Sequence, residues 1–237
     1  TGRWRSLTRR SFIARLALTG LLPGSLLLQT PANAGAFEDF FLALEFDDEY
    51  RLRNLLLKGM DPNTVNEQGF PAIVFAMMKD SPKAVQTLIS SNNLNPDLAD
   101  IRGETPLMVA SSLNKPEWVS ALLAKGAKQG GDGQWTALHN AAASGSVKSI
   151  EALLKAGGNI NVLSPNESTP LMMAARQGRA EAVRALLRLG ANPGLINQAG
   201  YNAAGYAMKA DRKELAYEIM KKERALRKAP LKPNKTN

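Results

Sequence analysis

The sequence contains no cysteine and only one histidine, and these two shortages exclude several kinds of site. Without thiols, neither disulfide bridges nor thiolate metal sites can form, and one imidazole cannot build a multi-histidine zinc site. The G-x-S-x-G, P-loop and H-E-x-x-H patterns are also missing from the sequence. We therefore expect no metal, no cofactor, no small-molecule substrate and no enzymatic activity.

Long apolar runs are also scarce. The most apolar stretch near the N-terminus, residues 16–28, offers about 13 positions and is broken by Pro23 and Gly24, whereas a membrane-spanning helix needs about 20. The whole chain of 237 residues is 44% hydrophobic and 22% charged, which is enough for one sizeable core. The composition thus predicts a soluble globular protein.

The formal net charge of +9 belongs to the two ends of the chain. Residues 1–34 contain five basic and no acidic side chains, and residues 209–237 contain ten basic and four acidic ones. The body between them, residues 35–208, has fifteen basic and seventeen acidic side chains. Because the body is close to neutral, the charge does not indicate a nucleic-acid-binding domain.

The N-terminal 34 residues have the layout of an export signal: arginines, a short apolar stretch and the small-residue sequence PANA, which ends at Ala34. Within it, TRRSFI at residues 8–13 resembles the twin-arginine motif of bacterial precursors. Thr8 replaces the usual serine and Ala14 the frequent lysine, so the general secretory route stays open as the alternative. Either route predicts a periplasmic or secreted protein whose mature chain starts at Gly35.

Beyond residue 35 the sequence repeats itself. GETPLMVASS, QWTALHNAAASG and ESTPLMMAARQG align on Thr105, Thr136 and Thr169, with spacings of 31 and 33 residues. Weaker copies start near Pro71 and Asn202, and a second apolar helix pattern such as AVRALLRLGANP follows each copy. A fixed period near 33 is typical of stacked helical repeats.

These repeats resemble the ankyrin repeat family, whose motif is T-P-L-H-x-A followed by L-L-x-x-G-A-x-x-N. The resemblance implies an all-α-dominated solenoid of helix-turn-helix units with short hairpin fingers. It divides the chain into an export signal (1–34), an N-terminal capping helix pair (35–66), about five repeats (67–226) and a basic, disordered tail (227–237).

Capping chemistry explains the motif. A threonine N-cap accepts a hydrogen bond from an unpaired backbone N–H, and a proline at the next position loses no helical hydrogen bond. Thr105 and Thr169, each followed by proline, are therefore expected to start helices. Gly126, Gly157 and Gly190 are expected to end the second helices of their units in a left-handed conformation.

The single histidine, His139, occupies the fourth position of TALH, where the family resemblance implies a structural hydrogen-bonding role. The densest group of carboxylates lies in the expected cap and comprises Glu38, Asp39, Glu45, Asp47, Asp48 and Glu49. A pair of acids could serve a glycosidase, but a terminal repeat also needs a polar outer face. We interpret these acids as solvated surface.

A partner protein would bind to the concave surface that fingers and first helices form in such solenoids. Three of the five residues that precede a helix start are aromatic: Phe70, Trp135 and Tyr201. Aromatic side chains are common binding anchors. The expected polar residues of this surface are Arg102, Glu104, Arg176, Gln177 and Lys209.

The alternative for the aromatic residues is a hydrophobic staple, in which the residue before an N-cap packs on the fourth helical residue. Phe70 would meet Phe75, and Tyr201 would meet Tyr206. Trp135 would meet Asn140, a poor partner, so Trp135 is the favoured binding residue.

The sequence therefore predicts an exported, monomeric ankyrin-like scaffold that binds a protein partner. A second hypothesis is association of the basic C-terminal tail with an anionic membrane surface or, less readily, with nucleic acid. A third is an effector that binds a host protein.

Overall fold

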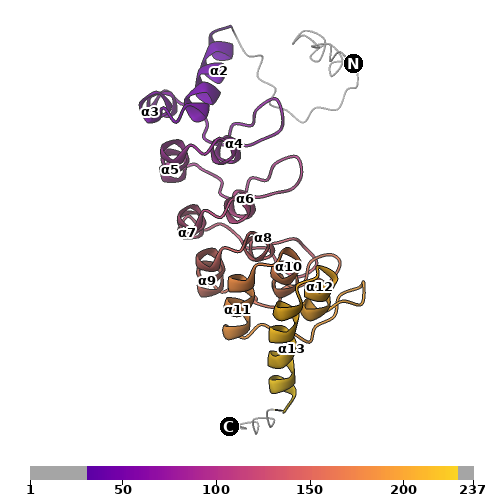
Figure 1. The fold of residues 1–237 in the computed structure, drawn as a ribbon. Helices are drawn as coiled ribbons and strands as arrows, with labels where there is room; N and C mark the ends of the chain where they lie inside the picture. Colours follow the sequence, from indigo (N-terminus) through magenta and orange to yellow (C-terminus); the bar gives the residue numbers. More distant parts are fainter. Residues whose placement is uncertain (1–30, 229–237) are drawn as a thin grey trace, which may run out of the picture. The chain divides into compact units, whose positions relative to one another are not determined.

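The computed structural model describes residues 31–228 (Figure 1). The chain divides into two parts after residue 37, and the repeat units described below lie in the second part. The described part contains twelve α-helices and no β-strand. They are α2 (Pro31–Glu45), α3 (Glu49–Leu57), α4 (Ala72–Met78), α5 (Pro82–Ser90), α6 (Pro106–Ser112), α7 (Pro116–Ala124), α8 (Ala137–Ser144), α9 (Val147–Lys155), α10 (Pro170–Gln177), α11 (Ala180–Arg188), α12 (Ala203–Lys209) and α13 (Lys213–Lys228).

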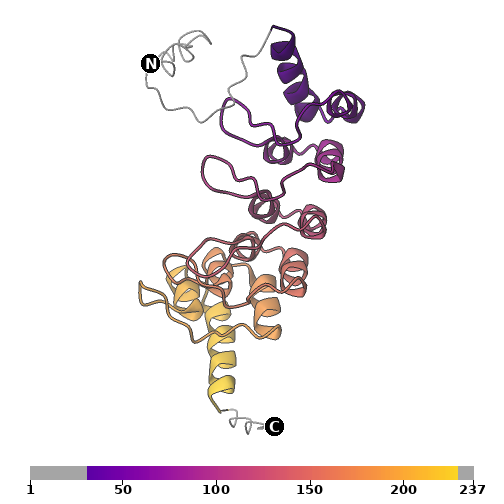
Figure 2. The same cartoon turned by 180° about the vertical axis from the view of Figure 1, so that it is seen from behind.

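The helices from α4 onward form two rows. The first helices of the units, α4, α6, α8, α10 and α12, each pack against the next member of their row. The second helices, from α5 to α13, do the same, and α3 packs against α5. Figures 1 and 2 show the loops that precede the first helices projecting away from the row of second helices. This arrangement confirms the predicted solenoid of helix-turn-helix units.

The core lies between the two rows and continues from unit to unit. In the unit of α6 and α7, for example, α6 contributes Leu107 and Ala110 and α7 contributes Val119 and Leu122, and all four side chains are fully buried. One helix pair cannot cover its own apolar side, so each unit depends on its neighbours for burial. The leucines and alanines of the repeats are thus committed to packing.

The two predicted threonine caps are present. The Thr105 and Thr169 hydroxyls accept hydrogen bonds from the backbone N–H groups of Met108 and Met172. Asn202 accepts a bond from Gly205 N at 2.8 Å. Pro71, which replaces threonine in the first copy, caps its helix without a side-chain bond.

The structure adds two details to the expected layout. Helix α13 continues to Lys228, two residues into the expected tail, and the guanidinium of Arg227 pairs with Glu223 one turn earlier. The fingers are turns without regular strands in residues 31–228, and one isolated bridge joins Val65 to Pro71. The twin-arginine pair, the apolar stretch at residues 16–28 and the tail from residue 229 lie outside the described residues.

Candidate protein-binding surface

His139 joins two consecutive units. Its side chain is fully buried at the start of α8, where Nδ1 lies 2.9 Å from the Thr136 hydroxyl. Nε2 lies 3.0 Å from the carbonyl oxygen of Ser168 in the next unit. Burial lowers the pKa of His139, and the Ser168 carbonyl opposes this shift only in part. A neutral, enclosed imidazole with these partners is a structural residue, as the resemblance implied.

Trp135 lies beside this histidine and remains 42% exposed. The indole meets the imidazole edge to face, with ring centroids 5.4 Å apart. The staple pattern pairs Trp135 with Asn140 and does not predict this contact. Because His139 is held from two sides, it orients the indole while leaving much of the ring open to a partner.

Trp135, Arg102 and Glu104 line one cleft of about 630 Å³ between neighbouring fingers. The lining of the cleft includes Met108 on α6 and Asn140 on α8, and Lys128 and Gln134 contribute polar groups from the second finger. The cleft thus combines apolar and charged groups in one place. Of the eight residues predicted to bind a partner, Trp135, Arg102 and Glu104 come together in this cleft.

Arg102 is fixed in the cleft wall by two carboxylates. Its guanidinium lies 2.8 Å from Asp100 and 2.7 Å from Glu104. Burial alone would raise the pKa of Asp100, but hydrogen bonds from the Arg102 side chain and from the backbone N–H groups of Glu104 and Arg102 lower it below its ordinary value. Asp100 is therefore ionised at neutral pH, and the finger that carries Arg102 is rigidly held.

Phe70 takes part in the same finger region from the preceding unit. The Arg102 guanidinium lies over its ring, 5.6 Å from the centroid. This cation–π contact links residues 32 positions apart in the sequence, and no local pattern could have revealed it. Phe70 is half-buried and supports Arg102.

The remaining predicted residues lie one or two units further along the solenoid than Trp135. Tyr201 packs against Tyr206 with ring centroids 5.3 Å apart, which confirms the expected staple pair. The Lys209 Nζ lies over the Tyr201 ring, 4.8 Å from its centroid. Arg176 and Gln177 are exposed in the last turn of α10. These four residues do not line the cleft at Trp135.

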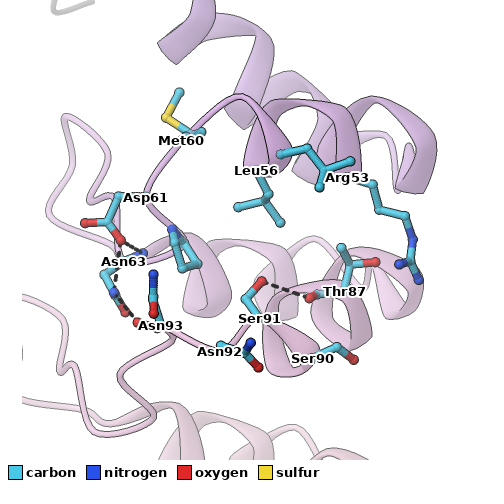
Figure 3. A pocket seen from close by; sticks show the side chains of 13 residues that line it. Arg53, Leu56, Met60, Asp61, Asn63, Thr87, Ser90, Ser91, Asn92 and Asn93 are labelled. Atoms are coloured by element: carbon cyan, nitrogen blue, oxygen red, sulfur yellow. Dashed lines mark hydrogen bonds between the residues drawn. The ribbon is translucent and has the colours of Figure 1, made fainter.

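A second pocket, of about 750 Å³, was not anticipated from the sequence. Figure 3 shows side chains of α3 and its following turn, such as Arg53 and Met60, facing residues of α5 and its following turn, such as Asn92. The Thr87 hydroxyl at its wall is buried and has no hydrogen-bond partner within the described residues. The pocket lies on the side of the second helices, and none of the predicted partner residues lines it.

Clusters of metal ligands and helices able to span a membrane are both missing from the part of the chain that the structure describes. In residues 31–228 no group of three or more histidine, cysteine, aspartate or glutamate side chains could hold a metal ion. Over the same range no helix is both long and apolar enough to cross a bilayer.

The fold and the surface define a helical-repeat scaffold that presents fingers and first helices to a partner. The family model for ankyrin repeats (3 copies) matches residues 40–130, 81–164 and 138–228, and the chain belongs to this family. Ankyrin repeats generally mediate protein–protein interactions and are not catalytic domains.

Two individual proteins are similar to the chain. The fold matches the crystal structure of an ankyrin repeat domain from Acinetobacter baumannii with a TM-score of 0.68 and 23% identity, covering 77% of this chain and 96% of that domain. In sequence the chain is 27% identical over 139 residues to the human transient receptor potential cation channel subfamily A member 1. That match covers 54% of this chain and 12% of the channel, so the likeness is confined to a small part of the channel.

Proposed function

We propose that this protein is an exported scaffold that binds a partner protein through its fingers and first helices, the concave side of this architecture. The observation that carries the proposal is Trp135, which is 42% exposed at the mouth of a cleft and held from behind by a buried histidine. A large aromatic side chain that is already ordered loses little rotational freedom when it is covered.

The composition of the cleft supports a protein partner. Trp135 and Met108 offer apolar area, while the paired charges of Arg102 and Glu104 and the amide of Asn140 offer hydrogen bonds at its edges. A central aromatic anchor surrounded by polar groups is the common layout of protein interfaces.

Site-specific photocrosslinking tests the proposal. A photoreactive phenylalanine analogue is placed at Trp135 and, as a matched control, at Tyr217, which is 64% exposed on the second-helix side. We expect a covalent adduct with one defined protein from position 135 and none from position 217. Equal adducts from both positions, or adducts from 217 alone, would move the partner to another surface.

Export is the second part of the proposal, and its support is the arrangement of Arg9 and Arg10, an apolar stretch and the PANA sequence. Cell fractionation of a bacterium that produces the chain tests this part. The parent chain is expected in the periplasm, and an Arg9→Lys, Arg10→Lys variant is expected to accumulate inside the cell. A variant exported as well as the parent would favour the general secretory route.

A further inference from the structure

Basic side chains precede three of the second helices, α7, α11 and α13, and each reaches back to the preceding unit. The Arg179 Nε donates to the carbonyl oxygen of Ala143 at 3.0 Å, and Arg212 Nη1 donates to the carbonyl oxygen of Arg176 at 2.8 Å. Both bonds reach back 36 residues, so each arginine covers the turn of the preceding unit in the same way. Lys115, at the equivalent place two units earlier than Arg179, reaches back to Asp80.

The partners of these basic side chains differ between the earlier and the later units. In the earlier unit the cation is neutralised, because Lys115 pairs with Asp80. In the later units Arg179 and Arg212 have only backbone carbonyls as partners within residues 31–228. Their positive charge is not cancelled by a carboxylate there.

Two more cations join them on the first helices. Arg176 and Lys209 occupy equivalent positions, seven residues after Thr169 and Asn202, in the last turns of α10 and α12. Both are exposed. We call Arg176, Arg179, Lys209 and Arg212 the basic edge.

Most carboxylates near this edge form ion pairs with cations outside it. Asp211 lies 3.6 Å from Lys213, and Glu181 lies 2.7 Å from Arg184. Glu214 is the one nearby acid without an ion pair inside the described part of the chain. The edge therefore keeps an excess of positive charge.

The arginines of the edge are also ordered before any partner binds. The Arg212 guanidinium lies directly against Gly178, and the Arg179 side chain lies against Gly145, so both stems are held over glycine turns. Each guanidinium uses one N–H for a carbonyl and keeps others that can bind a carboxylate in a two-bonded geometry. Such ordering lowers the entropic cost of binding.

We propose that the basic edge binds an acidic segment of the partner protein. This inference rests on the proposed function and adds the chemistry of a second contact region, separate from the Trp135 cleft, which none of the four residues lines. Its cations come from equivalent positions in consecutive units, and an extended acidic chain can cross such an array as it follows the solenoid.

The surroundings favour a peptide over nucleic acid. Single-stranded nucleic acid is held by basic residues together with open aromatic faces on which bases stack. The aromatic residue next to the edge, Tyr201, is packed against Tyr206 on one side and covered by Lys209. Its ring is therefore only partly open to a base.

Fluorescence polarisation with a labelled peptide of ten alternating glutamate and glycine residues tests the inference on the full chain. An Arg176→Gln, Arg179→Gln, Arg212→Gln variant is compared with a Lys221→Gln, Lys222→Gln, Arg224→Gln control. The control loses the same three charges from exposed positions of α13. Circular dichroism checks that both remain helical.

We expect the parent to bind the peptide at low salt and lose it as salt rises. The edge variant should bind about tenfold more weakly, the combined effect of three surface ion pairs, and the control less than about twofold. An Arg179→Lys, Arg212→Lys variant, which keeps the charge, should fall between them. Trp135→Ala should leave peptide binding unchanged, because the cleft is a separate region.

Three results would overturn the inference. They are absence of binding at low salt, equal weakening in edge variant and control, and tighter edge-dependent binding of an oligonucleotide or of phosphatidylserine vesicles than of the peptide. If the peptide does not bind but a partner still crosslinks at position 135, the proposed function stands and the proposed contact with an acidic segment is rejected.

Discussion

The Nε2 atom of His139 lies 3.0 Å from the carbonyl oxygen of Ser168, 29 residues later in the next unit. This bond ties the start of α8 to the finger that precedes α10. The same imidazole supports Trp135 through its ring edge. One buried side chain therefore connects the stacking of two units to the orientation of the proposed binding residue.

Acid should weaken the fold through His139. Burial lowers its pKa in the folded chain below the ordinary value of 6.5, so protonation favours the unfolded state. The stability it contributes is complete above pH 6.5 and is lost as the pH falls toward the folded pKa. We expect the Tm of the parent to fall between pH 7 and pH 5. The His139→Gln variant should have a lower Tm than the parent at pH 7, and its Tm should change less over this range. An equal change of Tm with pH in the two chains would contradict this role.

Asp100 should be essential for the finger that carries Arg102. Its carboxylate accepts backbone hydrogen bonds from Arg102 N and Glu104 N at 2.8 and 3.0 Å. Asp100→Ala leaves two donors without their acceptor and should cost about 1–3 kcal/mol in urea unfolding. Asp100→Asn keeps one acceptor oxygen and should cost less. Equal losses in both variants would show that hydrogen bonding is not the cause.

Trp135→Ala should separate binding from stability. The substitution removes the ring contact with His139, worth about 1 kcal/mol beyond the apolar area that the 42%-exposed indole buries. A lost anchor residue weakens a complex by about 2 kcal/mol, or roughly 30-fold. Calorimetric titration of the crosslinked partner, once identified, measures this change. Tyr217→Ala, which also removes an exposed ring, should bind like the parent.

Gly178 should tolerate no side chain. It has φ of +68° at the end of α10 and lies against the Arg212 guanidinium. Gly178→Ala should destabilise the chain by about 1–2 kcal/mol, the cost of a left-handed non-glycine residue. The control is Gly131→Ala, because Gly131 has no left-handed φ and open space around an added Cβ. A similar loss in both variants would rule out the conformational explanation.

The sequence predicted the features that repeat within one unit. Thr105, Thr169 and His139 perform the expected roles because capping depends on residues three or four positions away. Gly126, Gly157 and Gly190 likewise have the expected positive φ. Local spacing is sufficient for such features.

Contacts between units could not be predicted in the same way. Arg102 meets Phe70 and Arg212 meets the carbonyl of Arg176 across more than 30 residues. These pairs depend on how far one unit is rotated against the next, which the repeat length does not specify. The Trp135 packing was missed because the staple pattern considers the fourth helical residue, whereas the indole meets His139, the third.

The most direct measurement of the central claim is capture from a periplasmic extract of the producing bacterium. The bait is the parent chain, compared with a Trp135→Ala, Tyr201→Ala, Arg176→Ala variant that circular dichroism shows to be helical. We predict that one protein is retained by the parent and lost by the variant, and that it is the protein crosslinked at position 135. Equal retention by both chains would contradict binding through the fingers and first helices.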